Sequence, residues 1–208
     1  MDRRAALFQG VNLPIQHNIK DLQKGLNNAA RRQIPFAVSL GINKTLEDVK
    51  RNTDKRLLRV LDNPTPFTMR AFKIRRSSKR RLTGSVAAQS IQADYLKWAE
   101  DGGTRTPEGQ AIVVPVGQRV NKYGNLPRRS IARLLARPDT FSGSPGRGRR
   151  RGGIYKRTKR GLKLMVAYVG RARYSERLRF VETATKTAAA RFAVQIDRAL
   201  RRALKTAR

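Results

Sequence analysis

Few residues of this chain could carry catalysis. His17 is the only histidine, and near the start of a predicted helix it is expected to be a surface or cap residue, so a serine or threonine nucleophile would have no evident base. There is no cysteine, so thiol and zinc-thiolate chemistry are excluded. Four of the 14 acids fall in one window, Asp94, Glu100, Asp101 and Glu108, and paired carboxylates can hold Mg²⁺ for phosphodiester cleavage. We expect these acids instead to neutralise nearby arginines or to contact a basic partner surface. The prediction is a protein that is not an enzyme and binds no metal, cofactor or small-molecule substrate.

Net charge is the strongest functional signal. The chain has 47 Lys and Arg against 14 Asp and Glu, a formal net charge of +33 over 208 residues. So many like charges repel one another in a folded protein, and binding a polyanion relieves that repulsion. Between Gly109 and Ser175 there are 17 basic residues and a single acid, Asp139. We therefore expect this middle stretch to face nucleic acid.

Two basic runs, at 75–81 and 147–160, are the candidate contacts. Both combine Arg and Lys with Gly and Ser rather than with exposed aromatic residues, which disfavours base stacking on single strands. A short helix expected at 128–137 offers too few polar side chains for readout of the major groove. The remaining mode of nucleic-acid binding is sequence-independent contact with the phosphates of double-stranded DNA. The predicted nucleic-acid-binding residues are Arg75, Arg76, Lys79, Arg80, Arg81, Arg147, Arg149, Arg150, Arg151, Lys156, Arg157, Lys159 and Arg160.

Apolar periodicity predicts helices near both ends of the chain. Residues 1–16 are expected to form an N-terminal arm. From Ile15, apolar residues recur every three or four positions, which predicts a helix. Pro35 should separate this helix from a second one over about 46–61. A longer stripe predicts a C-terminal helix over about 176–207, with Ser175 as its N-cap.

Strands are expected between these helices. Pro115 within an apolar run indicates a strand at a sheet edge or the end of a strand. The apolar residues 162–169 indicate a strand covered on both faces. The expected strands span 66–74, 82–90, 111–116 and 162–169.

These elements predict an α+β fold, with a central antiparallel sheet that carries long basic hairpin loops and is packed by N-terminal helices and a long C-terminal helix. We expect an arm at 1–16 and a single domain over 17–208, with a mobile basic loop at about 142–161. No apolar run approaches the roughly 20 residues of a membrane span, and residues 1–5 lack the apolar run of a secretory signal. We expect no membrane partner.

A series of short motifs runs through the same segments. They are Asn63-Pro64-Thr65-Pro66-Phe67-Thr68 after a basic helix, Tyr95-Leu96-Lys97-Trp98-Ala99-Glu100-Asp101-Gly102-Gly103-Thr104-Arg105, Ile112-Val113-Val114-Pro115-Val116, Asn121-Lys122-Tyr123-Gly124-Asn125-Leu126-Pro127, and a closing helix rich in Ala, Arg and Lys preceded by Tyr174. As a series, over roughly residues 19–208, they resemble the minor tail protein Z and tail-completion (neck) proteins of long-tailed bacteriophages.

The resemblance implies a virion protein of the tail or neck, assembled in the host cytoplasm. It implies a homo-oligomeric ring, a hexamer or dodecamer, that completes the tail and joins it to the DNA-filled head. The partners would be tail terminator and head-tail connector proteins and double-stranded DNA. The matching residues would be structural, with Trp98 in the core, glycines at positive φ and a tight Asn-Gly turn. They are Pro66, Trp98, Gly102, Gly103, Asn121, Tyr123, Gly124 and Asn125.

Two other function classes remain open. A ribosomal or other ribonucleoprotein structural protein that binds RNA would explain the charge equally well, but the motif series and the long amphipathic helices less well. A magnesium-dependent nuclease would use the acids of the 94–108 window. An acidic protein surface, rather than DNA, is the other partner that the basic loops could meet.

Overall fold

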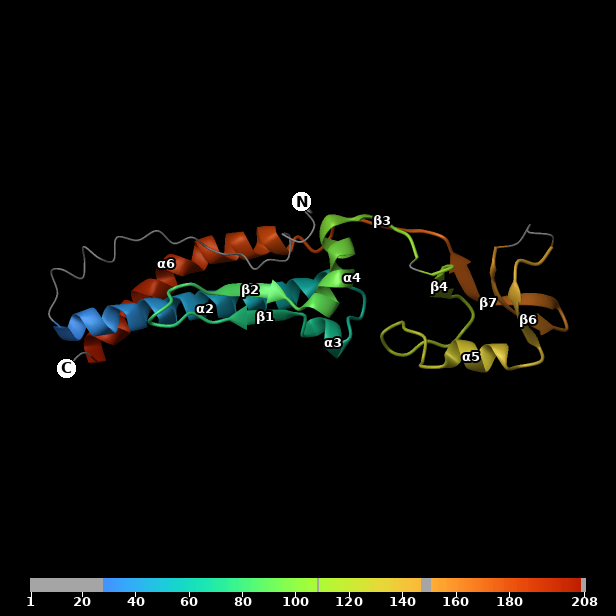
Figure 1. The fold of residues 1–208 in the computed structure, drawn as a ribbon, viewed down its shortest axis with the longest axis horizontal. Coiled ribbons are helices and arrows are strands. Elements are labelled where there is room, and N and C mark those ends of the chain that lie inside the picture. The colour runs from blue at the N-terminus through green and yellow to red at the C-terminus, as the bar shows by residue number, and fades with distance from the viewer. Residues whose placement is uncertain (1–27, 108, 147–150, 207–208) are drawn as a thin grey trace. The chain divides into compact units, whose positions relative to one another are not determined.

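The computed structural model describes residues 28–107, 109–146 and 151–206 (Figure 1). The predicted arm at 1–16, and most of the helix expected from Ile15, lie outside these residues. The chain forms two compact units: residues 1–100 with 177–208, called here the helical unit, and residues 101–176, the sheet unit. The sequence predicted a single domain over 17–208, whereas the structure divides into these two units. The α+β class is confirmed, because long helices and antiparallel sheets occupy separate stretches of the chain.

Two long helices, α2 (Asn28–Val60) and α6 (Phe180–Thr206), lie side by side in the helical unit (Figure 1). Small residues permit their close approach: a Cβ added to Gly41 would lie 3.0 Å from the Cα atom of Ile196. Apolar residues of α2 and alanines of α6 are buried in the helical unit. They are Ile34, Ala37, Val38, Ile42, Leu46, Val49 and Leu57 on α2, and Ala184, Ala188, Ala199 and Ala203 on α6.

Pro35 lies inside α2, so the predicted break between two helices is wrong. A proline in a helix interior costs about 3 kcal/mol, because it lacks an N–H and its ring crowds the carbonyl four residues earlier. Ile34, Ala37 and Val38 beside it are buried, and burial of each large aliphatic side chain stabilises the fold by about 1.5–3 kcal/mol. Tertiary packing therefore carries the helix through the proline.

A two-stranded hairpin packs on α2. Its strands β1 (Phe72–Arg75) and β2 (Ser85–Ala88) are antiparallel. Phe72 is fully buried, and its ring stacks on that of Phe180 with 4.5 Å between centroids. The N-terminal long helix thus covers this small sheet, whereas the larger sheet belongs to the sheet unit.

The predicted strand over 66–74 is wrong in its first half, where the short helix α3 (Pro66–Met69) forms. Thr65 is its N-cap, since the Thr65 hydroxyl accepts a hydrogen bond from the Thr68 amide at 3.2 Å. Pro66 occupies the first turn, where its fixed φ suits a helix and its missing N–H costs nothing. The Thr-Pro pair is a local signal that outweighs the apolar run after it.

The N-terminus of α6 is capped by a residue distant in sequence. Glu100, at the end of α4 (Ser90–Asp101), is 8% exposed. Its carboxylate accepts hydrogen bonds from the amides of Phe180 at 2.7 Å and Val181 at 3.3 Å. The predicted N-cap Ser175 is therefore wrong, because a buried carboxylate from another helix satisfies the first amides of α6 five residues later.

The sheet unit is built on a four-stranded antiparallel sheet in the order β4-β7-β6-β5. As predicted from Pro115, β4 lies at an edge. Leu134 of α5 (Ser130–Leu135) forms a small core with Ile154 and Val166 of the sheet. A separate ladder joins β3 to β8. The strands are β3 (Gly103–Arg105), β4 (Ile112–Pro115), β5 (Thr140–Gly143), β6 (Gly153–Thr158), β7 (Gly161–Val169) and β8 (Ala172–Tyr174).

The predicted loop at 142–161 is wrong over much of its length. β6 and β7 form a hairpin whose connection is only Lys159 and Arg160, with Thr158 paired to Gly161. Gly161 has φ +116°, a value that favours glycine at a tight hairpin turn. Ile154 and Tyr155 are adjacent and both buried, so no apolar–polar alternation marked this strand within the basic segment. Burial of these two side chains fixes the strand.

Candidate nucleic-acid interface

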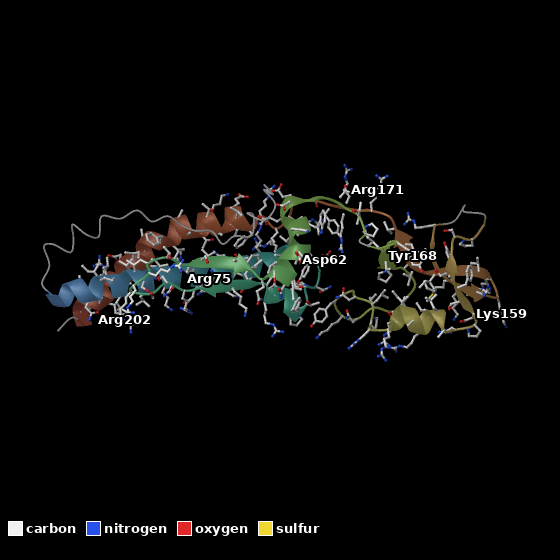
Figure 2. The ribbon with its side chains drawn as sticks, in the orientation of Figure 1. Asp62, Arg75, Lys159, Tyr168, Arg171 and Arg202 are labelled. Atoms are coloured by element: carbon white, nitrogen blue, oxygen red, sulfur yellow. The ribbon has the colours of Figure 1, made fainter. Side chains whose placement is uncertain are left out.

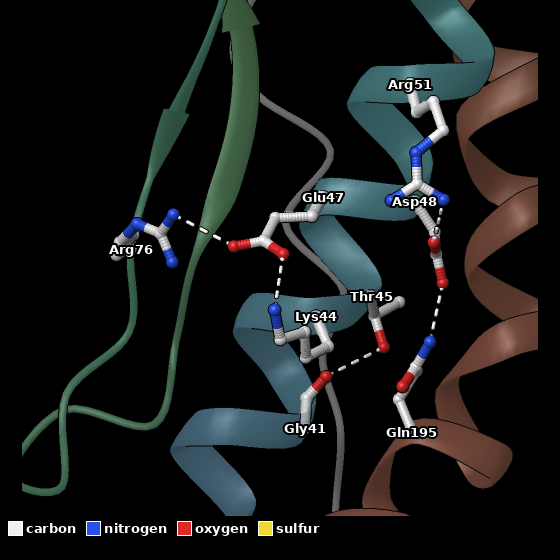
Figure 3. Close-up of polar contacts among 8 residues, drawn as sticks. All are labelled: Gly41, Lys44, Thr45, Glu47, Asp48, Arg51, Arg76 and Gln195. Atoms are coloured by element: carbon white, nitrogen blue, oxygen red, sulfur yellow. Dashed lines mark hydrogen bonds and ion pairs between the residues drawn. The ribbon is translucent and has the colours of Figure 1, made fainter.

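The first predicted basic run, 75–81, begins in β1 and continues into the loop that follows. Arg75 ends the strand and is exposed (Figure 2), and Lys79, Arg80 and Arg81 are exposed in the loop. Arg76 is not available in the same way: its guanidinium donates to the Glu47 carboxylate of α2 at 2.9 Å (Figure 3). The run therefore divides into one exposed arginine paired with the long helix and four other exposed cations.

Ser77 fastens this loop to α2. Its side chain is buried, and its hydroxyl donates to the carbonyl of Ser39 at 3.0 Å. Its amide donates to the Asn43 side-chain oxygen at 2.8 Å, and the Asn43 amide group donates back to the Ser77 carbonyl at 3.1 Å. A basic loop with a fixed base presents its cations at defined positions, which lowers the entropy lost on binding.

The second predicted run, 147–160, is described from Arg151 onward; Arg147, Arg149 and Arg150 lie outside the described residues. Lys159 and Arg160 are exposed at the hairpin tip, and Lys159 is marked in Figure 2. Arg151 is also exposed. Two residues of the run have partners within the sheet unit. Lys156 is half-buried, and its Nζ atom lies 3.5 Å from the Oδ2 atom of Asp139. The guanidinium carbon of Arg157 lies over the ring of Phe141, 4.6 Å from the ring centroid.

Sequence reasoning missed a second group of cations, Arg119, Lys122, Arg133 and Arg137. They line a cleft of about 560 Å³ within the sheet unit, between the segment after β4 and α5. We call it the basic cleft. All four side chains are exposed, so the cleft is accessible to solvent. The only sequence signal was their shared place in the acid-poor stretch, because their spacing matches no motif.

A tight turn forms one rim of this cleft. The side-chain oxygen of Asn121 accepts hydrogen bonds from the amides of Tyr123 at 2.9 Å and Asn125 at 3.0 Å, and Gly124 has φ +77°. The turn predicted from these Asn and Gly residues is confirmed. It holds Lys122 with its ammonium 5.1 Å from the centroid of the Tyr123 ring.

The other motif residues have structural places. Gly102 and Gly103 have φ +66° and +105°, as predicted. Trp98 is half-buried, so its expected place in the core is wrong. The buried face of α4 is formed by Gln92, Leu96 and Glu100 at four-residue spacing, and Trp98 falls off that face.

Several cations of the two long helices are paired with acids. Asp48 lies between the long helices and accepts hydrogen bonds from Arg51 at 2.9 Å and Gln195 at 2.7 Å (Figure 3). Other pairs on the two long helices have the same character: Lys44–Glu47, Lys50–Asp54, Lys186–Glu182 and Arg201–Asp197. In the stretch 109–175 the single acid, Asp139, pairs with Arg137 and Lys156.

The acids of the 94–108 window do not form a common site among the described residues. Glu100 caps α6, Asp94 and Asp101 are exposed, and Glu108 is outside the described residues. Within residues 28–107, 109–146 and 151–206, no group of three or more Asp, Glu or His side chains could hold a metal ion. In the same part of the chain, no helix has the length and hydropathy needed to cross a membrane.

Comparisons of the chain with protein-family models, with curated proteins and with solved structures found no match.

Proposed function

We propose that this chain is a structural protein of the head-tail junction of a long-tailed bacteriophage, and that its exposed basic side chains contact the phosphates of double-stranded DNA. The observation behind the DNA-binding part is the contrast between the two long helices and the stretch 109–175. Acids neutralise many cations of the long helices, whereas the stretch 109–175 has one acid for 17 basic residues. Unpaired surface cations of one sign create the field that attracts a polyanion.

The form of the basic surface supports duplex binding without base readout. The exposed cations of the two hairpin tips, Lys79, Arg80, Lys159 and Arg160, come from turns. The six-residue α5 is too short to lie along a major groove as a recognition helix. The tips carry no aromatic residue for stacking. Phosphate contact fits a duplex that must be held or passed through a lumen whatever its sequence.

The assignment to the neck rests on the motif series described above. A homo-oligomeric ring would repeat the basic surface around a central DNA and multiply its charge. Tail terminator and head-tail connector proteins are its proposed partners, and the virion its location. Light scattering after size exclusion should show one discrete oligomer; a strictly monomeric protein at all concentrations would contradict the ring.

A salt titration of duplex binding tests the DNA contact. The slope of log K against log salt should be about −7 for eight phosphate contacts, at roughly 0.9 for each. Replacing Lys79, Arg80, Lys159 and Arg160 by Ser should reduce the magnitude of this slope by about 3.6. A matched variant removes the same charge from the paired cations Lys44, Lys50, Lys186 and Arg201, and it should change the slope by less than about 1.

Three outcomes would count against the proposal. An equal fall in salt slope in both variants would show a diffuse effect of net charge. Failure of the protein to bind duplex at low salt would contradict the DNA contact altogether. Tighter binding to a double-stranded RNA of the same length, at the same salt, would favour the ribonucleoprotein alternative.

A further inference from the structure

The four cations that line the basic cleft are up to 18 residues apart in the sequence, from Arg119 to Arg137. Its volume, about 560 Å³, falls in the range of small-ligand sites. Leu134 and Val120 contribute apolar wall, and apolar walls strengthen electrostatic attraction by lowering the local dielectric. A concave site lined by four cations therefore concentrates positive potential at one place on the sheet unit.

One of the four cations is already neutralised. Arg137 donates to both carboxylate oxygens of Asp139, at 3.1 and 3.3 Å. Desolvation opposes ionisation of Asp139, but the hydrogen bond from Arg137 and the charges of Arg137 and Lys156 hold the pKa of its carboxyl below the usual value. Asp139 is the only acid of the stretch 109–175. Arg119, Lys122 and Arg133 therefore have no acid of that stretch left to pair with.

Two of these three side chains are held in place before any ligand binds. The Arg133 guanidinium donates one hydrogen bond, to the Arg128 carbonyl at 2.9 Å, which leaves its other N–H groups for a ligand. Lys122 lies over the Tyr123 ring within the turn that Asn121 closes. Pre-positioned cations lose little side-chain entropy on binding.

We infer that the basic cleft is a phosphate-binding site, in which Arg119, Lys122 and Arg133 contact neighbouring phosphates of one DNA strand. Guanidinium groups match phosphate oxygens with paired hydrogen bonds, and successive phosphates bring several negative charges to one place. A single carboxylate of an acidic protein would leave two of the three cations unneutralised. The inference rests on the proposed function for the source of the phosphates, but the chemistry of the cleft does not depend on it.

Chemical footprinting of the wild-type protein tests the site without any folding risk. An arginine-specific dicarbonyl reagent and a lysine-acetylating reagent are applied with and without a random-sequence duplex, and modification is read by mass spectrometry. We expect duplex to lower the reactivity of Arg119, Lys122 and Arg133 at least threefold. Arg70 and Lys186, exposed in the helical unit, are the references and should change less than twofold.

Two further arms distinguish the ligands. Inorganic pyrophosphate, at matched ionic strength, should protect the same three residues at higher concentration, whereas poly-glutamate of equal charge should not. Equal protection by poly-glutamate would overturn the phosphate assignment in favour of an acidic protein partner. Unchanged cleft reactivity in a protein that does bind duplex would overturn the inference and leave the proposed function standing.

If the protein does not bind duplex, the proposed DNA contact fails and the pyrophosphate arm decides the cleft by itself: protection supports a phosphate site, and no protection overturns it. A variant with Arg119, Lys122 and Arg133 replaced by Ser gives a second measure. It should lose duplex affinity about tenfold or more at low salt, with a fall in salt slope of about 2.7. The charge-matched variant of Lys44, Lys186 and Arg201 should lose less than threefold; equal losses would contradict a localised site.

Discussion

Replacing Glu100 with alanine should destabilise the helical unit by about 1.5–4.5 kcal/mol. The Glu100 carboxylate is buried and accepts the amides of Phe180 and Val181. Its removal leaves the Phe180 N–H buried without a partner, which costs about 1–3 kcal/mol, and it also breaks the longer bond to Val181, worth about 0.5–1.5 kcal/mol. The lost negative charge at the positive end of the α6 dipole acts in the same direction.

Urea unfolding measures this effect directly. Trp98 is the only tryptophan and lies in α4, the helix that carries Glu100, so its fluorescence reports on the affected region. Asp101→Ala is the matched control, because it removes the same charge one residue later from an exposed position; it should cost less than about 0.5 kcal/mol. Glu100→Gln keeps one oxygen acceptor and should fall between the two.

An equal fall in the free energy of unfolding for Glu100→Ala and Asp101→Ala would contradict this expectation. In that case the carboxylate would not be the cap on which α6 depends. The same pair of variants also addresses the nuclease alternative, since magnesium-dependent DNA cleavage lost in Asp101→Ala would show that the acids of this window carry chemistry.

Two more perturbations test the contact between the long helices. Burial opposes the charge of Asp48, but hydrogen bonds led by that from Gln195 hold the pKa of its carboxyl below the usual value. Ionised Asp48 therefore stabilises the fold at pH values above the unfolded-state pKa. This stabilisation is lost as the pH falls through the lower folded-state pKa. Asp48→Asn should weaken the pH dependence of the unfolding free energy between about pH 2 and 6, and superimposable profiles would contradict this. Gly41→Val should cost about 1–3 kcal/mol, because its side chain would crowd the backbone of Ile196; Gly170→Val, at an open position, is the control and should cost clearly less in the same thermal melts.

Local sequence signals predicted those parts of the fold that depend on neighbouring residues. Stripes of apolar residues predicted α6 and helix on both sides of Pro35, but not the continuity of α2. Pro115 predicted an edge position or a strand end, because a strand centre cannot lack a hydrogen-bond donor. The positive φ of Gly102 and Gly103 and the Asn121 turn, expected as structural features of the motif series, agree with the local backbone preferences of Gly and Asn. Even local signals competed: the cap formed by Thr65 converted the start of an apolar run into helix.

Contiguous basic runs indicated only part of the candidate interface. A run of charges in sequence shows which residues are adjacent along the chain, but not which have acidic partners after folding. Arg76 pairs with Glu47, 29 residues away, and Lys156 pairs with Asp139 across two strands. The basic cleft depends in the same way on the fold, which brings Arg119 and Arg133 to one cavity.

The net charge, the acid-poor middle stretch and the mixture of long helices with short strands follow from composition and from periodicity along the chain. The continuation of α2 through Pro35, the cap that Glu100 provides to a helix 80 residues later, and the pairing of particular cations with acids follow from the folded arrangement. Each of these depends on contacts between residues far apart in sequence. Their free energies arise from burial and from the desolvation of charges, which no local pattern records.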